Sequence, residues 1–239
     1  REAFQALAML AAGVGLLAGL SVGSGKAASG GPAAAAGYTL RGAAQRGVFW
    51  QMTAAFALLG MVLSGVIAHL TSIWQGLGIS AVHVPAFQAT VGMATIAGRL
   101  GGGAMMDLVP AHFVGAVAAL LGAAGIALLA SGPDTALLLL LVGIALGVCT
   151  GAESDVISYL SSRYFGLRNF ARIYAVQGSF FMIGFALGPL VAAYSLDRGG
   201  IPATLAGGAV VLLGSATMLA ILRAPPPASG ESPAVGRGP

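Results

Sequence analysis

Residues 135–160, TALLLLLVGIALGVCTGAESDVISYL, are strongly apolar in their first half and carry two carboxylates in their second half. A helix that crosses the hydrocarbon core of a bilayer needs about 20 predominantly apolar residues. This stretch is therefore long enough for one transmembrane helix. Glu153 and Asp155 stand out within it, because a charge at the centre of such a helix costs about 2.5–3.5 kcal/mol.

The rest of the chain has the same apolar character. Of its 239 residues, 57% are hydrophobic and only 8% are charged, whereas soluble domains carry about 25% charged residues. So few charges cannot cover a surface that faces water. The 38 glycines fit helices that approach closely in a membrane. The composition predicts an all-α, polytopic membrane protein that has the lipid bilayer as its first partner.

Seven stretches are long and apolar enough to span: 3–23, 48–70, 82–106, 111–131, 135–160, 172–196 and 201–222. A polar break rich in Gly, Ala and Pro separates the first two, and it predicts a linker with a short interfacial helix around 38–46. The predicted domains are a transmembrane helix at 1–23, a linker at 24–47, a six-helix bundle at 48–222 and a disordered tail at 223–239.

Lys and Arg gather on one side of these spans. Nine belong to the linker, the tail and alternate loops with their edges: Lys26, Arg41, Arg46, Arg99, Arg163, Arg168, Arg172, Arg223 and Arg237. The other side, with loops 71–81, 132–134 and 197–200, has Arg1 and Arg198. By the positive-inside rule the richer side is cytoplasmic, as are the linker and the C-terminus.

Seven spans that begin outside are an unusual number for a complete protein. The first residue is Arg1, and the first apolar run follows almost at once. We therefore expect the chain to be a fragment or a processed product, preceded in the complete polypeptide by five further helices.

The segment Gly98-Arg-Leu-Gly-Gly-Gly103-Ala-Met-Met-Asp107 closes the third span and enters a predicted cytoplasmic turn. It resembles the Gly-x-x-x-Asp loop signature of the major facilitator superfamily, in the copy found in the second half of the family fold. The resemblance implies that Arg99 and Asp107, with the two glycines, belong to a gating loop. The family signature continues with basic residues, whereas this chain continues with 108–110, Leu-Val-Pro.

A second resemblance lies at 159–168, YLSSRYFGLR, which is followed by Tyr174 and by the sequence GFALGP at 184–189. It is similar to the loop between helices 10 and 11 and to helix 11 of bacterial major facilitators near the monocarboxylate and oxalate–formate group. The spans then correspond to helices 6 to 12. Arg163 and Arg168 would belong to the loop motif.

The resemblance implies secondary active transport of a small organic solute, with carboxylates as one class, by alternating access between two six-helix bundles. It also implies coupling to protons as a symporter or antiporter in a bacterial plasma (inner) membrane. The N-terminal bundle of the same polypeptide would be a partner. Monocarboxylate carriers have Asp four residues before an Arg in helix 8, where this chain has Thr95. Oxalate–formate carriers place a cation within helix 11, where this chain offers Gln177.

The carboxylates of the fifth span are the natural candidates for chemistry. Residues two apart diverge by about 200° around a helix, so at most one of Asp155 and Glu153 faces a central cavity. Either could accept the coupled proton, or both could be structural and pair with Arg163, Arg168 or a neighbouring backbone. The other candidates for lining a cavity with hydrogen-bonding groups are Tyr159, Tyr174, Gln177 and Ser179.

Gly184 and Gly188 have the spacing of a helix-packing motif. Pro189 follows directly and predicts a possible kink that could serve as a hinge. A role in packing alone is the alternative.

Other classes of function have little support in the sequence. The only cluster that resembles an intramembrane hydrolase is Ser154 between the two carboxylates, with His69 and His83 near helix ends, so we predict that the chain is not an enzyme. No HExxH or Cys/His cluster predicts a metal, no P-loop predicts ATP hydrolysis, and no basic aromatic patch predicts nucleic acid. We expect no cofactor. The alternative to transport is a non-transporting membrane sensor or subunit on a transporter scaffold.

Overall fold

The computed structural model describes residues 37–132 and 135–223, which all belong to one compact unit. Within these residues the regular structure is helical, apart from one isolated bridge between Gly37 and Gly166. The elements are α2 (Leu40–Ala44), α3 (Gly47–Ala68), α4 (Leu70–Gly76), the 3-10 helix η1 (Ala81–His83), α5 (Val84–Leu108), α6 (Ala111–Ala130), α7 (Ala136–Phe165) and α8 (Phe170–Ala220).

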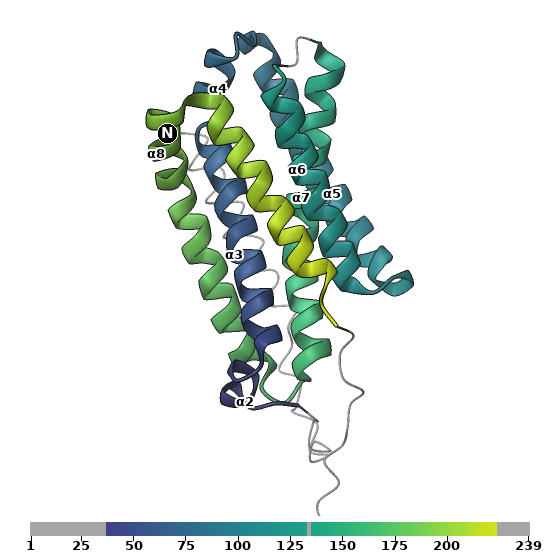
Figure 1. Ribbon diagram of the computed structural model, residues 1–239. Helices are drawn as coiled ribbons and strands as arrows, with labels where there is room; N and C mark the ends of the chain where they lie inside the picture. Colours follow the sequence, from purple (N-terminus) through teal and green to yellow (C-terminus); the bar gives the residue numbers. More distant parts are fainter. Residues whose placement is uncertain (1–36, 133–134, 224–239) are drawn as a thin grey trace, which may run out of the picture. The chain divides into compact units, whose positions relative to one another are not determined.

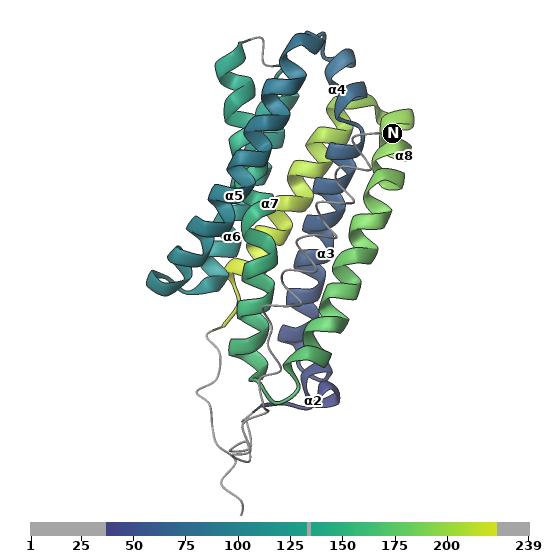
Figure 2. The same cartoon turned by 180° about the vertical axis from the view of Figure 1, so that it is seen from behind.

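Helices far apart in the sequence lie side by side in this unit. The helix α3 packs along α8, and α5 packs along α7. The helix α6 contacts both α7 and α8 and so joins the two pairs (Figures 1 and 2). The core runs through all of them, with large buried side chains such as Phe56, Leu63, Ile126 and Leu212.

Four helices in the described residues are long and apolar enough to cross a membrane: Gly47–Ala68, Ala111–Ala130, Ala136–Phe165 and Phe170–Ala220. The prediction of an all-α, polytopic membrane protein is confirmed. The helix α5 has 25 residues, which is long enough to span about 30 Å, although it is not among those four apolar helices. The predicted spans from 48 to 222 agree with helices α3, α5, α6, α7 and α8.

The helix α8 contains two of the predicted spans. It has 51 residues and is interrupted at Gly200, where φ is 70° and ψ is −175°. A side chain at that position would strain the backbone, so glycine allows the chain to turn sharply. Residues 170–199 form one leg and 201–220 the returning leg, coloured green and yellow in Figure 1. The break falls within the predicted loop 197–200, and Pro189 lies inside the first leg.

The connection after the second predicted span differs from the prediction. Residues 71–81 were expected to form a loop, but α4 occupies most of this stretch. Its Ile73 and Trp74 are buried, and Trp74 makes an edge-on contact with Phe87 of α5. The segment is helical because these two side chains bury an apolar face against the bundle.

Glycines allow the closest helix contacts. A Cβ atom at Gly184 would collide with the backbone of Ala57, and one at Gly188 would collide with the Met61 carbonyl and the Ser64 side chain. Both glycines therefore let the backbone of α8 pack directly against the backbone of α3, which is the geometry expected for small residues in membrane helices. Gly151 of α7 lies against the Thr95 carbonyl of α5 in the same way.

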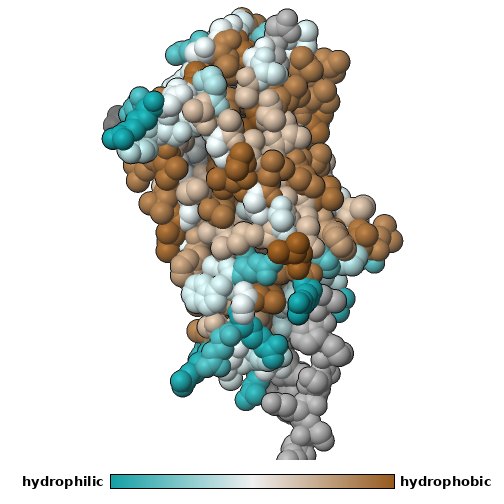
Figure 3. All heavy atoms as spheres, in the orientation of Figure 1, coloured by the Kyte–Doolittle hydropathy of each residue, from teal (hydrophilic) through white to brown (hydrophobic). Residues whose placement is uncertain are grey.

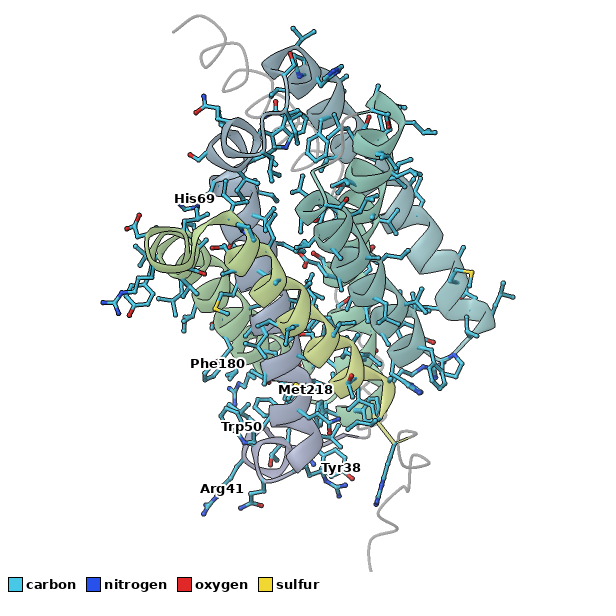
Figure 4. The ribbon with its side chains drawn as sticks, turned by 45° about the horizontal axis from the view of Figure 1, so that its top comes forward. Tyr38, Arg41, Trp50, His69, Phe180 and Met218 are labelled. Carbon is cyan, nitrogen blue, oxygen red and sulfur yellow. The ribbon has the colours of Figure 1, made fainter. Side chains whose placement is uncertain are left out.

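The segment before α3 is fastened to the loop between α7 and α8. The backbone N–H of Tyr38 donates to the Phe165 carbonyl over 2.8 Å, and the Asn169 side-chain amide donates to the Tyr38 carbonyl over 3.1 Å. Trp50 makes an edge-on contact with Phe180, with ring centroids 5.7 Å apart. In Figure 4 the labelled residues Tyr38, Trp50 and Phe180 lie towards one end of the bundle, and His69 lies towards the other. A short helix is present within the predicted 38–46 stretch as α2.

The C-terminal end of α8 reaches the same end of the bundle. The hydroxyl of Tyr164 donates to the Arg223 carbonyl over 2.5 Å, and the side-chain amide of Gln51 donates to the Met218 carbonyl over 2.6 Å. Residues 37–47, the 161–171 loop and the end of α8 therefore lie together. This arrangement agrees with the grouping of cationic segments on a single side of a membrane.

The sides of the helices are covered by apolar groups. Exposed side chains such as Met93, Leu190 and Val210 belong to helices that a soluble protein would cover with charges. Figure 3 shows apolar side chains over the middle of the helices and hydrophilic ones gathered towards the ends. Such a surface suits contact with lipid.

Several predictions concern residues outside the described part of the chain. These are the transmembrane helix at 1–23, the linker up to 36 and the tail from 224 onward.

Candidate functional site

The two carboxylates of α7 face different neighbours, as their spacing predicts. Asp155 lies on the side of α7 that faces α5, whereas Glu153 lines a cavity bounded by α3 and α8. The polar residues of the fifth predicted span therefore form two separate groups.

Asp155 is paired with Arg99 of α5. The Nε atom of Arg99 lies 3.7 Å from Oδ2 of Asp155, and the side chains are 56% and 38% exposed. This is the one ion pair among the described residues. The prediction that Asp155 pairs with Arg163 or Arg168 was wrong. Arg163 lies in the last turn of α7, and Arg168 lies beyond the end of that helix. Close contact between Gly151 and the backbone of Thr95 and Arg99 brings α5 near enough for this pair.

Glu153 lies in the wall of a cavity of about 480 Å³. Its side chain is only 8% exposed, and its Oε2 atom has no hydrogen-bond partner. The cavity is also lined by Phe56 of α3, by Ser154 of α7 and by residues of α8 that include Tyr174 and Ser179. The predicted cavity residues Tyr174 and Ser179 are thus brought together with Glu153.

Gln177 does not line this cavity. It is fully buried between α7 and α8, where its Oε1 atom accepts a hydrogen bond of 2.5 Å from the Ser161 hydroxyl. Its Nε2 atom has no partner among the described residues. No signal in the sequence links Ser161 to Gln177, because they belong to different helices and are 16 residues apart.

Tyr159 is engaged with Arg163, one turn further along α7. The Nε and Nη2 atoms of Arg163 donate to the Tyr159 hydroxyl over 3.1 and 2.9 Å. The two side chains cover the exposed face of α7 beyond Asp155. Arg168 is exposed in the following loop, so the two predicted loop cations are not part of the cavity.

The predicted loop motif is spread over the end of α5. A Cβ atom at Gly98 would collide with the backbone of Val148, so this glycine allows α5 to approach α7. Gly103 has open space beside it, and Asp107 is exposed in the last turn of α5. No side-chain hydrogen bond of Asp107 is found within 37–132 and 135–223.

His69 and His83 lie at helix ends, and Cys149 lies in the core of the bundle. A ring nitrogen of His69 is 3.2 Å from the Gly65 carbonyl at the end of α3, and His83 precedes α5. Cys149 is fully buried. In the described part of the chain, no three His, Cys, Asp or Glu side chains lie close enough to hold a metal ion.

Sequence reasoning missed the aromatic walls of the cavity. Phe56 of α3 and Phe181 of α8 line it together with Glu153. Apolar aromatic residues in membrane helices are common, so only the packing of α3 against α8 distinguishes these two from lipid-facing ones.

Comparison with known families provides the assignment. A sequence model described as Major Facilitator Superfamily matches residues 116–238, which is half of the chain and covers most of α6 and all of α7 and α8. No curated protein matches the chain. With its apolar helices, its close glycine contacts and this match, the chain belongs to the major facilitator superfamily.

Proposed function

We propose that the chain forms part of a secondary active transporter that moves a small organic solute by alternating access, with a proton as the coupling ion. Membership of the family supports membrane transport in general. The observation that carries the finer proposal is the ion pair between Arg99 and Asp155. It joins two helices inside a bundle that has few other charges.

A proton can regulate such a pair. While Asp155 is ionised, it neutralises the guanidinium of Arg99. Protonation of Asp155 removes its negative charge and leaves the guanidinium free to bind another anion. A carboxylate solute is the matching ligand, because the planar guanidinium donates two parallel hydrogen bonds to a carboxylate. Proton binding and solute binding would then depend on each other.

We propose that the protein lies in a bacterial plasma membrane with α2, the 161–171 loop and the C-terminus in the cytoplasm. The cationic residues near that end support this orientation. Two bundles surround the central site in the proposed mechanism, and residues from the N-terminal bundle of the same polypeptide would complete it. The proposal includes no enzymatic step, and no histidine is found among the described residues that line the cavity with Ser154.

Proton-driven uptake in cells that express the complete polypeptide tests this proposal. We expect Asp155→Asn to abolish the stimulation of radiolabelled lactate or oxalate uptake by an inward proton gradient, because asparagine cannot take up the coupled proton. Asp197→Asn is the matched control, since Asp197 is exposed in the first leg of α8 and should leave uptake unchanged.

The protein level in the membrane is measured by immunoblot for both variants. Unchanged gradient-driven uptake in Asp155→Asn would overturn the coupling role. A purified protein that binds these carboxylates but never moves them across a vesicle membrane would favour the sensor alternative.

A further inference from the structure

The cavity beside Glu153 contains a carboxyl group that the described residues leave unpaired. The side chain of Glu153 is more than nine-tenths buried, and its Oε2 atom accepts no hydrogen bond. No Lys, Arg or His nitrogen in the described residues lies within 4.0 Å of its carboxylate, because the one ion pair there joins Arg99 to Asp155. Arg99 is engaged with Asp155 on the α5 side of α7.

An unpaired carboxylate is costly in this position. Transfer of an ionised carboxylate into apolar surroundings is unfavourable by several kcal/mol unless a counter-charge and hydrogen bonds compensate it. The cavity that Glu153 lines is mainly apolar, with Phe56 on one helix and Phe181 on another. Glu153 therefore needs either a proton or a cation from outside the described residues.

The walls of the cavity favour an organic cation. The faces of Phe56, Tyr174 and Phe181 can attract a positive charge through their ring quadrupoles, by about 0.5–2 kcal/mol for each contact. The hydroxyl of Ser179 donates to the Ala175 carbonyl over 2.8 Å, so its oxygen lone pairs remain available to accept an N–H. The volume of about 480 Å³ lies within the range of about 300–1,000 Å³ that small-molecule sites occupy.

We propose that this cavity is a binding site for the ammonium group of an amphiphilic organic cation, with the ammonium paired to Glu153 and its apolar body against the aromatic walls. This site goes beyond the proposed function, which requires only Arg99, Asp155 and a carboxylate solute. The two groups occupy different sides of α7. The protein would therefore bind a cation and an anion at separate places.

Two probes of the same shape and opposite charge test the site. Phenethylammonium and 3-phenylpropionate each join a phenyl ring to a charged group through two methylene carbons. Their binding to the purified chain in lipid nanodiscs is measured by isothermal titration calorimetry. We expect wild-type protein to bind phenethylammonium, and Glu153→Gln to bind it at least tenfold more weakly because the near-isosteric amide has no charge. Asp197→Asn should bind the cation as wild type does.

A second variant keeps the test valid if Glu153→Gln does not fold. Phe56→Leu retains the carboxylate and an apolar wall but removes one aromatic face, so we expect the cation to bind about fivefold more weakly. Binding of 3-phenylpropionate should depend on Arg99 instead, and Arg99→Gln should weaken it while cation binding remains. If only the cation fails to bind, the cavity site is wrong. If only 3-phenylpropionate fails to bind, the proposed function is wrong.

Three results would overturn the cation site. The first is equal binding of phenethylammonium to wild type and folded Glu153→Gln. The second is no measurable binding of the cation to the folded wild-type chain, which would mean that a proton alone neutralises Glu153. The third is cation binding that disappears in Arg99→Gln but persists in both cavity variants.

Discussion

Replacing Gly188 with leucine is expected to lower the midpoint of thermal unfolding by about 5–10 °C. The position lies where α8 meets α3, and a Cβ atom there would collide with the Met61 carbonyl and the Ser64 side chain. Ser64 also donates to the Phe185 carbonyl over 2.7 Å, so the collision would break a bond between the helices. Overpacking of this kind costs about 1–3 kcal/mol, and each kcal/mol shifts the midpoint by about 2–4 °C in a chain of this size.

The chain supplies its own reporter for this measurement. Cys149 is its only cysteine and is fully buried, so a thiol-reactive fluorogenic dye reacts with it only when the bundle opens. Gly214→Leu is the matched control, because it makes the same substitution on the same helix where no atom lies within 4 Å of the added Cβ. Equal midpoints for the two leucine variants would show that α3 and α8 do not meet at Gly188.

Replacing Arg99 with glutamate is expected to reduce transport of the carboxylate solute more than 100-fold. The substitution puts two carboxylates where an ion pair of 3.7 Å now lies, and like charges that close repel each other. It also removes the guanidinium that the proposed mechanism assigns to the solute. Initial rates of uptake, normalised to the amount of protein in the membrane, measure the effect.

The reciprocal exchange separates folding from transport. With Arg99→Asp and Asp155→Arg together, the pair is restored with its charges on the opposite helices. We expect Arg99→Glu to lower the midpoint of thermal unfolding and the double variant to restore it. Gradient-driven uptake should stay absent in the double variant, because the carboxylate and the guanidinium then project from the wrong helices. If the exchanged pair leaves the protein as unstable as Arg99→Glu, the contact between α5 and α7 at this position is not specific.

The sequence predicted the helices better than the connections between them. Apolar length alone located the spans from 48 to 222, because each helix must satisfy its backbone within about 30 Å of hydrocarbon. It did not predict α4. This short helix is stabilised because its side chains Ile73 and Trp74 are buried against the bundle, a contact that the local sequence does not reveal. The sequence did predict the connection at 197–200, where the backbone breaks at Gly200.

The candidate site was predicted in part. Helical periodicity alone indicated that Glu153 and Asp155 point in different directions. It could not identify Arg99 as the partner of Asp155, because that contact depends on how closely Gly151 allows α5 to approach α7. The aromatic wall beside Glu153 likewise comes from two helices, α3 and α8, that meet only in the fold. The transport roles of these residues remain predictions.

Cysteine accessibility in intact cells and in inside-out vesicles tests the membrane topology on which all these roles depend. In a Cys149→Ala background, single cysteines replace Arg41, Arg168 and Asp197, which are exposed, and each is treated with an impermeant maleimide. We expect Arg41→Cys and Arg168→Cys to react only in inside-out vesicles and Asp197→Cys only in intact cells. Labelling of the first two from opposite faces would contradict the assignment of these helices to a major facilitator bundle.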